Sequence, residues 1–553
     1  MDEICSRELA TGLDGTVDRL NVPREIQCPP SAHREEHVQF RRTSILLFST
    51  IIGIVGLLLF AGIMIDLGSS GRAFSEILEL VREQGLQTAL APLPEVLAAL
   101  LGIMLTVVAI VVQLAAQRYS TKVIDLFLRD STNLSFFLFM VVSCTYVTVV
   151  PMFAPESGPT PVVTVGIGLV LCIINFTLLL PYVAYVFTFL QPSNIIRRIE
   201  ADADRHLAGL VARENASHSQ IEAAQAQVAM SVERISDSCL SAIQQSDRYL
   251  AVYTLEVLEQ MLCSYLERES ELPEAWSRID KRHFYMLSKR HHEEIVESKV
   301  WVEAKILYEF EHAYRYALRL EDQDILARIA SATHAVGVKA IEVNDRRAVK
   351  MVIRFFNTFM RHALNVGQVR TCYTVLYQYR VLASHLRESH ADLLRRVCEH
   401  IVYYGRLARE KGAPFVTVTA AHDLSTLCLD AYGHDPQQAN RILKQMFTIV
   451  DADDDPERAN TVSIGMLQVF AILGTRLLER GDTSSVVAIQ AFLRKMPAGA
   501  LRRMKERTLA VTDWKFWEVT DRGDDFNYLP PSSRPHFERL LAAVHAASGD
   551  AAP

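Results

Sequence analysis

Four long apolar stretches without Asp, Glu, Lys or Arg, at residues 43–65, 96–117, 134–153 and 161–190, lie in the first third of this 553-residue chain. Each reaches across roughly 30 Å of bilayer hydrocarbon at about 1.5 Å per residue. Lipid offers no hydrogen-bond partner to backbone N–H and C=O groups, so an isolated apolar segment crosses it as a helix. We therefore predict four membrane-spanning helices, at residues 43–66, 92–117, 133–153 and 161–190.

Basic residues flank alternate ends of these stretches. Arg41 and Arg42 precede the first span, Arg118 and Lys122 follow the second, and the loop 154–160 after the third has no basic residue. Lys and Arg next to a span favour the cytoplasmic side of the membrane. This pattern predicts a multi-pass protein with both termini in the cytoplasm.

The polar remainder of the chain has the pattern of a helical protein. Apolar residues recur every three or four positions in runs of about two dozen residues, separated by glycine and proline. A pair of such runs approaches the period of roughly 40 residues that is typical of helical solenoids. No repeated signature residue is evident, so an irregular helical bundle is the alternative.

We thus expect an all-α protein with a four-helix transmembrane domain and a large, solenoid-like helical cytosolic domain. A helical stalk should continue the last span and connect the two domains. The expected divisions are a cytosolic tail at 1–42, the transmembrane domain at 43–190, the stalk and connector at 191–299, the repeat-like domain at 300–541 and a disordered tail at 542–553.

One narrow face of the second span carries small and polar side chains. At about 100° per residue, Gly102, Thr106, Gln113 and Gln117 fall within about 60° of Glu95, and most other positions are large and apolar. A polar side chain in hydrocarbon without a partner costs several kcal/mol, so this face must meet another helix or water. Two interpretations remain: close helix packing and a water-lined path.

A path would use further residues. If identical chains gathered around an axis with the narrow face inward, Glu95 would ring the outer mouth. Ile124 and Phe127 would form an apolar constriction beyond the inner end. Asn175 lies in the middle of the fourth span and needs a hydrogen-bond partner, most simply a glutamine or threonine of the second span. Hydrogen bonding inside the helix bundle is its expected role.

Three stretches of the chain resemble a known family. They read TVVAIVVQLAAQRYSTKVIDLFLRD, FFLFMVVSCTYVTVV and PVVTVGIGLVLCIINFTLLLPYVAYVFTFLQPSNIIRRI. They are similar to the bacterial family of predicted membrane proteins known as domain of unknown function 2254. The segment VERISDSCLSAIQQSDRYLAVYTLEVLEQML is also similar, although the Ser-Pro-Gly turn of the family is missing here. The resemblance implies a protein of the bacterial inner (plasma) membrane and no settled activity.

Signals for catalysis and metal binding are poor. The chain has no GxxxxGK phosphate loop, no GxSxG elbow and no dinucleotide fingerprint. His291 and Glu294 stand three apart on an expected helix without a second ligand pair, which favours a solvated charged face. The run VDADDDPE begins like a calcium loop, but Pro456 occupies the glycine position and Val462 the place of the closing glutamate. We therefore expect no enzyme, no cofactor and no metal site.

An aromatic and charged cluster, DWKFWEVTDRGDDFNYLPP, occupies residues 513–531. It either folds back onto the helical domain, the interpretation we favour, or docks a partner.

Two functions from different classes remain. The first is an oligomeric inner-membrane protein that conducts ions or a solute under the control of its helical cytosolic domain. The alternative is a non-conducting membrane-anchored scaffold or sensor that binds protein partners through that domain. The expected partners are the lipid bilayer, further copies of the chain and, in the second case, a cytosolic protein. No nucleic acid is expected.

Overall fold

The computed structural model describes residues 92–118, 127–128, 130–149, 162–212, 216–285, 287–450, 464–515, 522–523 and 525–546. The chain divides into two compact units, Met1–Val108 with Arg129–Phe187 and Ala109–Leu128 with Thr188–Pro553. Within the described residues every regular element is a helix. This confirms the all-α prediction.

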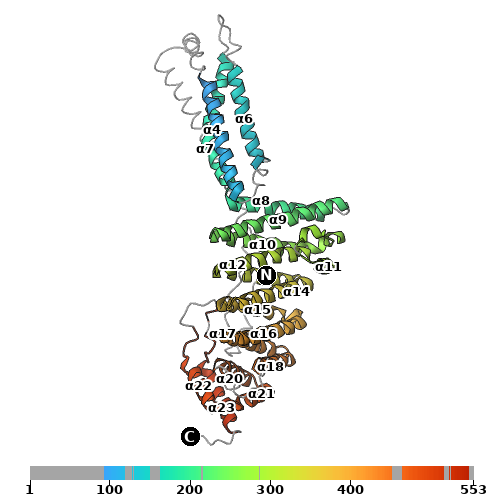
Figure 1. Cartoon of the computed structure of the whole chain (residues 1–553), viewed down its shortest axis with the longest axis vertical. Helices are drawn as coiled ribbons and strands as arrows, with labels where there is room; N and C mark the ends of the chain where they lie inside the picture. Colours follow the sequence, from blue (N-terminus) through green and yellow to red (C-terminus); the bar gives the residue numbers. More distant parts are fainter. Residues whose placement is uncertain are drawn as a thin grey trace, which may run out of the picture. The chain divides into compact units, whose positions relative to one another are not determined.

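Three helices of the described chain are long and apolar enough to cross a membrane. They are α4 (Leu93–Arg118), α6 (Ser131–Val149) and α7 (Val162–Phe189) (Figure 1). Their ends fall within four residues of three predicted spans. The sequence predicts four spans and the structure gives three candidates, because the first expected span, 43–66, lies outside the described residues.

Aromatic and polar contacts join the start of α6 to the end of α7. The Tyr185 hydroxyl donates to the Asp130 carboxylate at 2.7 Å, and the Tyr182 hydroxyl donates to Asn133 Oδ1 at 3.3 Å. The Tyr182 ring stacks on Phe136 with centroids 3.6 Å apart. Further along, Leu97 of α4 packs in one buried cluster with residues of α6 and α7, namely Val147 and Cys172.

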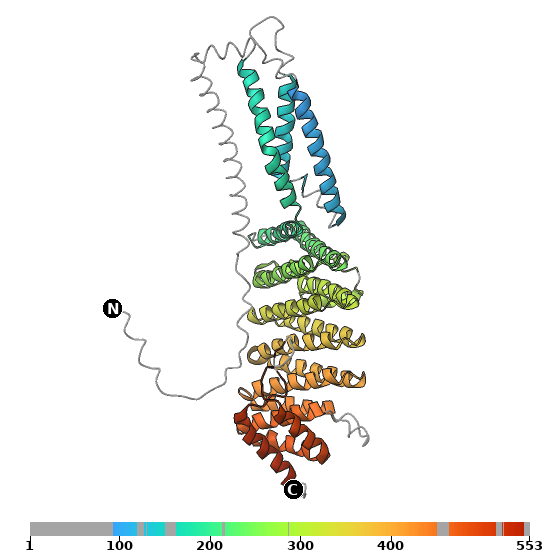
Figure 2. The same cartoon turned by 90° about the vertical axis from the view of Figure 1, so that its left-hand side faces the viewer.

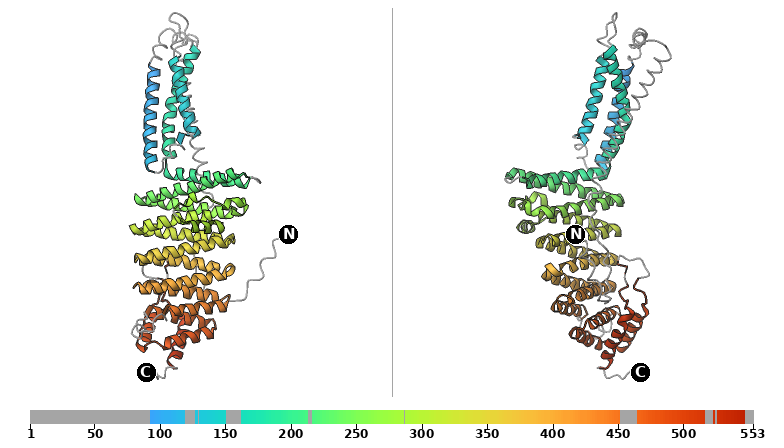
Figure 3. Two further views of the ribbon diagram at one scale, coloured as in Figure 1. Left: turned by 45° about the vertical axis from the view of Figure 1, so that its right-hand side comes forward. Right: turned by 180° about the vertical axis from the view of Figure 1, so that it is seen from behind.

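The second unit contains a stack of helices in two layers (Figures 2 and 3). In one layer α9, α12, α14, α16 and α18 contact each other in order, and in the other α10, α13, α15, α17 and α20 do so. The helices of the stack are α8 (Pro192–Val211), α9 (His218–Gln244), α10 (Arg248–Arg268), α11 (Lys289–Glu297), α12 (Trp301–Leu320), α13 (Gln323–Glu342), α14 (Arg346–Asn365), α15 (Val369–Ser389), α16 (Ala391–Glu410), α17 (Pro414–Tyr432), α18 (Pro436–Val450), α20 (Ile464–Glu479), α21 (Thr483–Arg494), α22 (Ala498–Ala510) and α23 (Arg534–Ala546).

The stack is an internal repeat with a period of 45 residues. The helices α12, α14, α16 and α18 begin at residues 301, 346, 391 and 436. The intervening helices α13, α15 and α17 begin at 323, 369 and 414. The predicted helical repeat is thus observed, with a period slightly longer than the roughly 40 residues expected from the apolar runs.

A recurrent turn, which the sequence patterns did not predict, precedes α10, α13 and α14. A residue with positive φ directly precedes the N-cap residue in Ser246–Asp247, Glu321–Asp322 and Asn344–Asp345. Each of the three aspartates accepts a hydrogen bond from a backbone N–H in the first turn of its helix. Such a side-chain cap satisfies one of the N–H groups that a helix start leaves open.

The stalk predicted to continue the last span is not observed. Helix α7 ends at Phe189, and Gln191 has an extended backbone with ψ 131°. Pro192 then begins α8, because a proline disfavours the helical conformation in the residue before it and fits the first turn of a new helix. Helix α8 packs along α9, so the helical stack starts at residue 192 and not at residue 300.

The aromatic segment near the carboxyl end folds back onto the stack, as expected. The Arg522 guanidinium pairs with the Asp423 carboxylate of α17 and donates to the Tyr373 carbonyl of α15 at 3.1 Å. The Phe526 ring stacks on His422 with centroids 4.0 Å apart. Both Arg522 and Asp423 are buried.

Candidate functional site

The narrow polar face predicted for the second span lies on the exposed side of α4. The side chains of Glu95, Thr106 and Gln113 are exposed, as is Gly102. Gln117 falls within α4, but its side chain lies outside the described part of the structure.

The opposite face of α4 is the packed one. Leu97, Met104 and Val108 are each 5% exposed or less. Leu97 follows Glu95 by two positions, which is about 200° around the helix. The polar face therefore lies away from the residues with which α4 packs in the described part of the chain.

Two residues of this face show how open it is. A Cβ atom added at Gly102 would meet no atom within 4 Å. The Thr106 hydroxyl donates to the Gly102 carbonyl one turn earlier at 2.8 Å, so it is satisfied within its own helix. A second helix has room to approach closely at these positions.

Other residues of the expected path have different surroundings. Phe127 is 4% exposed and packs edge-on against Phe189 with ring centroids 5.5 Å apart. Ile124 lies outside the described residues. Asn175 is buried and donates to the Leu171 carbonyl of its own helix at 2.7 Å, not to a residue of the second span. Since Asn175 is one turn from Leu171, the local bond replaces the expected interhelical one.

A second feature, which sequence reasoning missed, is an acidic cluster in the helical stack. Three residues form it: Glu269, in a short 3-10 turn (Glu269–Glu271) after α10; Glu303, in the first turn of α12; and Asp345, the N-cap of α14. One carboxylate oxygen from each lies within 4.8 Å of the others. The fold thus brings together three acids that are up to 76 positions apart in the sequence.

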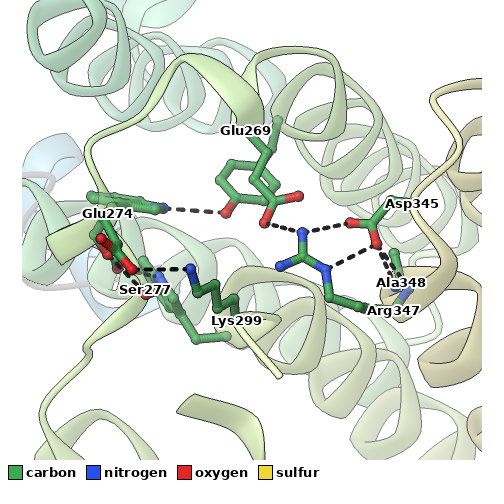
Figure 4. Close-up of polar contacts among 10 residues, drawn as sticks. Glu269, Glu274, Ser277, Lys299, Asp345, Arg347 and Ala348 are labelled. Atoms are coloured by element: carbon green, nitrogen blue, oxygen red, sulfur yellow. Dashed lines mark hydrogen bonds and ion pairs between the residues drawn. The ribbon is translucent and has the colours of Figure 1, made fainter. Parts of the chain in front are cut away.

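Arg347 partly neutralises this acidic cluster (Figure 4). One guanidinium nitrogen donates to Glu269 at 3.2 Å, and Nε donates to Asp345 at 3.3 Å. Asp345 also accepts from the backbone N–H groups of Arg347 at 2.8 Å and Ala348 at 3.2 Å. Two of the three acids therefore have cationic or N–H partners.

Glu303 is the exception. Its side chain is 0% exposed, and neither carboxylate oxygen has a hydrogen-bond partner. A buried carboxylate without a partner carries a large desolvation penalty. Burial and the charge of Glu269 hold the pKa of Glu303 well above its usual value.

The other two acids respond differently to their surroundings. Burial, followed by the hydrogen bond and charge of Asp345, raises the pKa of Glu269 to about 7. For Asp345, burial acts in the same direction, but hydrogen bonds from Arg347 and from backbone N–H groups outweigh it and lower the pKa. Burial thus favours the protonated form of the two glutamates, whereas the hydrogen bonds to Asp345 favour its ionised form.

A cavity of about 680 Å³ adjoins the acidic cluster and is lined by Glu269, Asp345 and Arg347 among others. Lys299, which also lines the cavity, donates to Glu274 at 3.4 Å (Figure 4). Among the other lining residues, Trp276 Nε1 donates to the Tyr265 hydroxyl at 3.2 Å. The lining is polar and charged, which favours small hydrophilic ligands and water over an apolar molecule.

The 45-residue period shows what is unusual about Glu303. At the equivalent positions of the following repeats stand Ala348, Leu393 and Gln438. The first two are buried core residues, and Gln438 donates to the Ala391 carbonyl at 3.3 Å. An acid at this position is the signal that an alignment of the repeats would have revealed in the sequence.

The sequence model of a family described as predicted membrane protein (DUF2254) matches residues 41–263. Over these residues the chain is similar to that family. The resemblance noted in the sequence is thereby confirmed. The DUF2254 segment contains the three spans α4, α6 and α7 and ends within α10, six residues before Glu269. The acidic cluster therefore lies just beyond it.

None of the curated proteins is similar enough to the chain to count as a match. Among solved structures, a circular tandem repeat protein with novel repeat topology and enhanced subunit contact surfaces shares 16% identity, over 66% of this chain and 87% of that one, with a TM-score of 0.30. A de novo designed helical repeat protein shares 14% identity, over 47% of this chain and 97% of that one, with a TM-score of 0.22.

Proposed function

We propose that the protein is a homo-oligomer of the bacterial inner membrane that conducts ions or a small solute, with its helical stack as a cytosolic regulatory domain. In this proposal both termini lie in the cytoplasm, as the distribution of basic residues favours. Helices α4 from several copies would surround the path. The observation that carries the proposal is that α4 buries one apolar strip, which contains Leu97, Met104 and Val108, and leaves its polar face exposed.

The cost of the polar face in lipid supports this arrangement. Gln113 lies within the candidate span Leu93–Ala115, near its carboxyl end, and its side chain is exposed in the single chain. An amide or carboxylate that faces hydrocarbon costs several kcal/mol, whereas a neighbouring helix or a water column satisfies it. Copies of α4 that face one another would offer Gln113 both kinds of partner.

Phe127 has no part in the proposed path. It is packed against Phe189, so it is a residue of the fold and not a side chain free to line a passage. The proposed lining is limited to Glu95, Gly102, Thr106 and Gln113, with Glu95 at the outer mouth, where a ring of carboxylates favours cations.

Flux through liposomes that contain the full chain tests the proposal. Gln113→Leu should decrease potassium or chloride flux, because it removes the polar group from the inner end of the path. Leu114→Ala changes an exposed neighbour on another side of α4 and should leave the flux unchanged. An absence of flux from wild-type protein that is a monomer in detergent would contradict the proposal and favour the membrane-anchored scaffold or sensor.

A further inference from the structure

We propose that Glu269, Glu303 and Asp345 form a binding site for a divalent cation with oxygen ligands, such as Ca²⁺ or Mn²⁺, between α10, α12 and α14. The site goes beyond the proposed conduction and does not depend on it. It would give the helical stack a ligand of its own.

The spacing of the three acids suits one ion. Calcium and its analogues bind carboxylate oxygens at about 2.3–2.6 Å, so two oxygens on the same ion lie no more than about 5 Å apart. The three oxygens of the acidic cluster lie within 4.8 Å of one another. Three protein ligands would then be in place without rearrangement of the backbone.

The charge balance also suits a divalent ion. Three carboxylates and the single guanidinium of Arg347 leave two negative charges in excess when all are ionised. Lys299 also lies near Glu269, but its charge is balanced by Glu274, with which it forms an ion pair. One divalent cation would make the acidic cluster neutral, as buried charges require.

Glu303 is the independent observation that points to a ligand. It is fully buried, its carboxylate reaches the other two acids, and neither of its oxygens has a partner. Packing alone does not call for an acid at this position, since Ala348 and Leu393 fill the equivalent positions of later repeats. An ion bound here would satisfy both oxygens.

The adjoining cavity provides access. Glu269, Asp345 and Arg347 line it, and the side chain of Arg347 is 45% exposed. The Arg347 side chain can therefore shift to admit an ion and still remain next to the carboxylates. The cavity also has room for the waters that would complete the coordination of the ion.

Terbium luminescence tests the site, because Tb³⁺ replaces Ca²⁺ at oxygen ligands and emits when a nearby Trp or Tyr is excited. Tyr265 lines the same cavity as Glu269, and the Trp276 ring lies 5.0 Å from that of Trp301. Full-length wild-type protein, stripped of metal with a chelator, should give saturable emission that Ca²⁺ displaces. It should also show a higher unfolding temperature in Ca²⁺.

Glu303→Gln should weaken binding by about tenfold or more, because it removes a charged ligand and keeps the shape of the side chain. Glu269→Gln, at the edge of the cavity, is the second variant if Glu303→Gln does not fold. The matched control is Glu274→Gln, which lines the same cavity but pairs with Lys299 outside the acidic cluster. It should bind like the wild type.

Two results would overturn the site. One is the absence of saturable emission and of any Ca²⁺-dependent stabilisation in the wild type, which would mean that a proton, and not a metal ion, neutralises Glu303. The other is equal binding by the wild type and both cluster variants. Because conduction and metal binding are measured separately, either proposal can fail without the other.

Discussion

Helix α14 of the stack is buried by the rest of the chain to a much greater extent than helix α4 of the membrane segment. In α14, 11 of 20 residues are buried, whereas only 22% of the most apolar window of α4 is buried. The packed face of α14 is large and aromatic, whereas the exposed surface of α4 combines large apolar side chains such as Ile103 and Leu114 with the small and polar face. The comparison teaches that the stack buries its helices with its own residues. The described spans leave most of their surface to lipid or, in our proposal, to other copies of the chain.

The largest effect that would sharpen this contrast is expected from two matched phenylalanines. Phe356 of α14 is 0% exposed and stacks on Tyr379 with centroids 5.0 Å apart, whereas Phe176 of α7 is 45% exposed. Phe356→Ala should cost about 3–5 kcal/mol of unfolding free energy, because it leaves a cavity in a packed core. Phe176→Ala should cost far less. Urea unfolding of both variants checks this. Equal losses of unfolding free energy would contradict the difference in packing between α14 and α7.

The next effect concerns the buried ion pair that holds the carboxyl-terminal segment. Arg522→Ala leaves the Asp423 carboxylate buried with a weaker set of partners and should cost about 3 kcal/mol. Burial disfavours the ionised form of Asp423, but Arg522 outweighs burial and lowers the pKa below its usual value.

The pH dependence of that cost has a definite sign. A lowered pKa in the folded state stabilises the protein above the unfolded pKa of about 3.9, and the gain is lost as pH falls through the folded value. The difference between wild type and Arg522→Ala should therefore be full near pH 7 and shrink in acid. Thermal unfolding from pH 7 to pH 3 measures it, and a difference that grows in acid would contradict the assignment.

A smaller effect separates two helical glycines. A Cβ added at Gly337 of α13 would lie 2.7 Å from Leu382 Cδ1 and 3.1 Å from Val352 Cγ1, whereas one at Gly102 would meet nothing within 4 Å. Gly337→Ala should destabilise the stack by about 1–3 kcal/mol through overpacking. Gly102→Ala should leave the stability of the single chain unchanged. Circular dichroism during thermal unfolding distinguishes them, and similar losses would refute this view of α4.

Much of the fold could be predicted because local signals and tertiary structure agree. The spans are apolar over the right length, and α12 to α18 keep the spacing of apolar residues that pairs of helices require. The helical pattern of the polar segment after the last span predicts a continuous helix, whereas the backbone breaks at Gln191, just before Pro192. The repeat period itself is set by turns such as Asn344–Asp345, whose left-handed residue differs from one turn to the next.

The acidic cluster could not be predicted in the same way. Glu269, Glu303 and Asp345 belong to three different helix pairs, and nothing in their local sequences sets them apart from solvated acids. Only the stacking of α10, α12 and α14 brings them together. Conversely, the polar face of α4 was fully visible in the sequence, because helical periodicity alone places Glu95, Gly102, Thr106 and Gln113 on one side.

The mass of the full-length protein in lipid nanodiscs tests most directly whether the exposed face of α4 joins copies of the chain. The account predicts several copies in a closed assembly for the wild type and a smaller assembly for Gly102→Leu, because that side chain fits the single chain but not a close interface. Gly209→Leu, at another open helical glycine in α8, should keep the wild-type mass. A single copy of the wild-type protein would contradict the account.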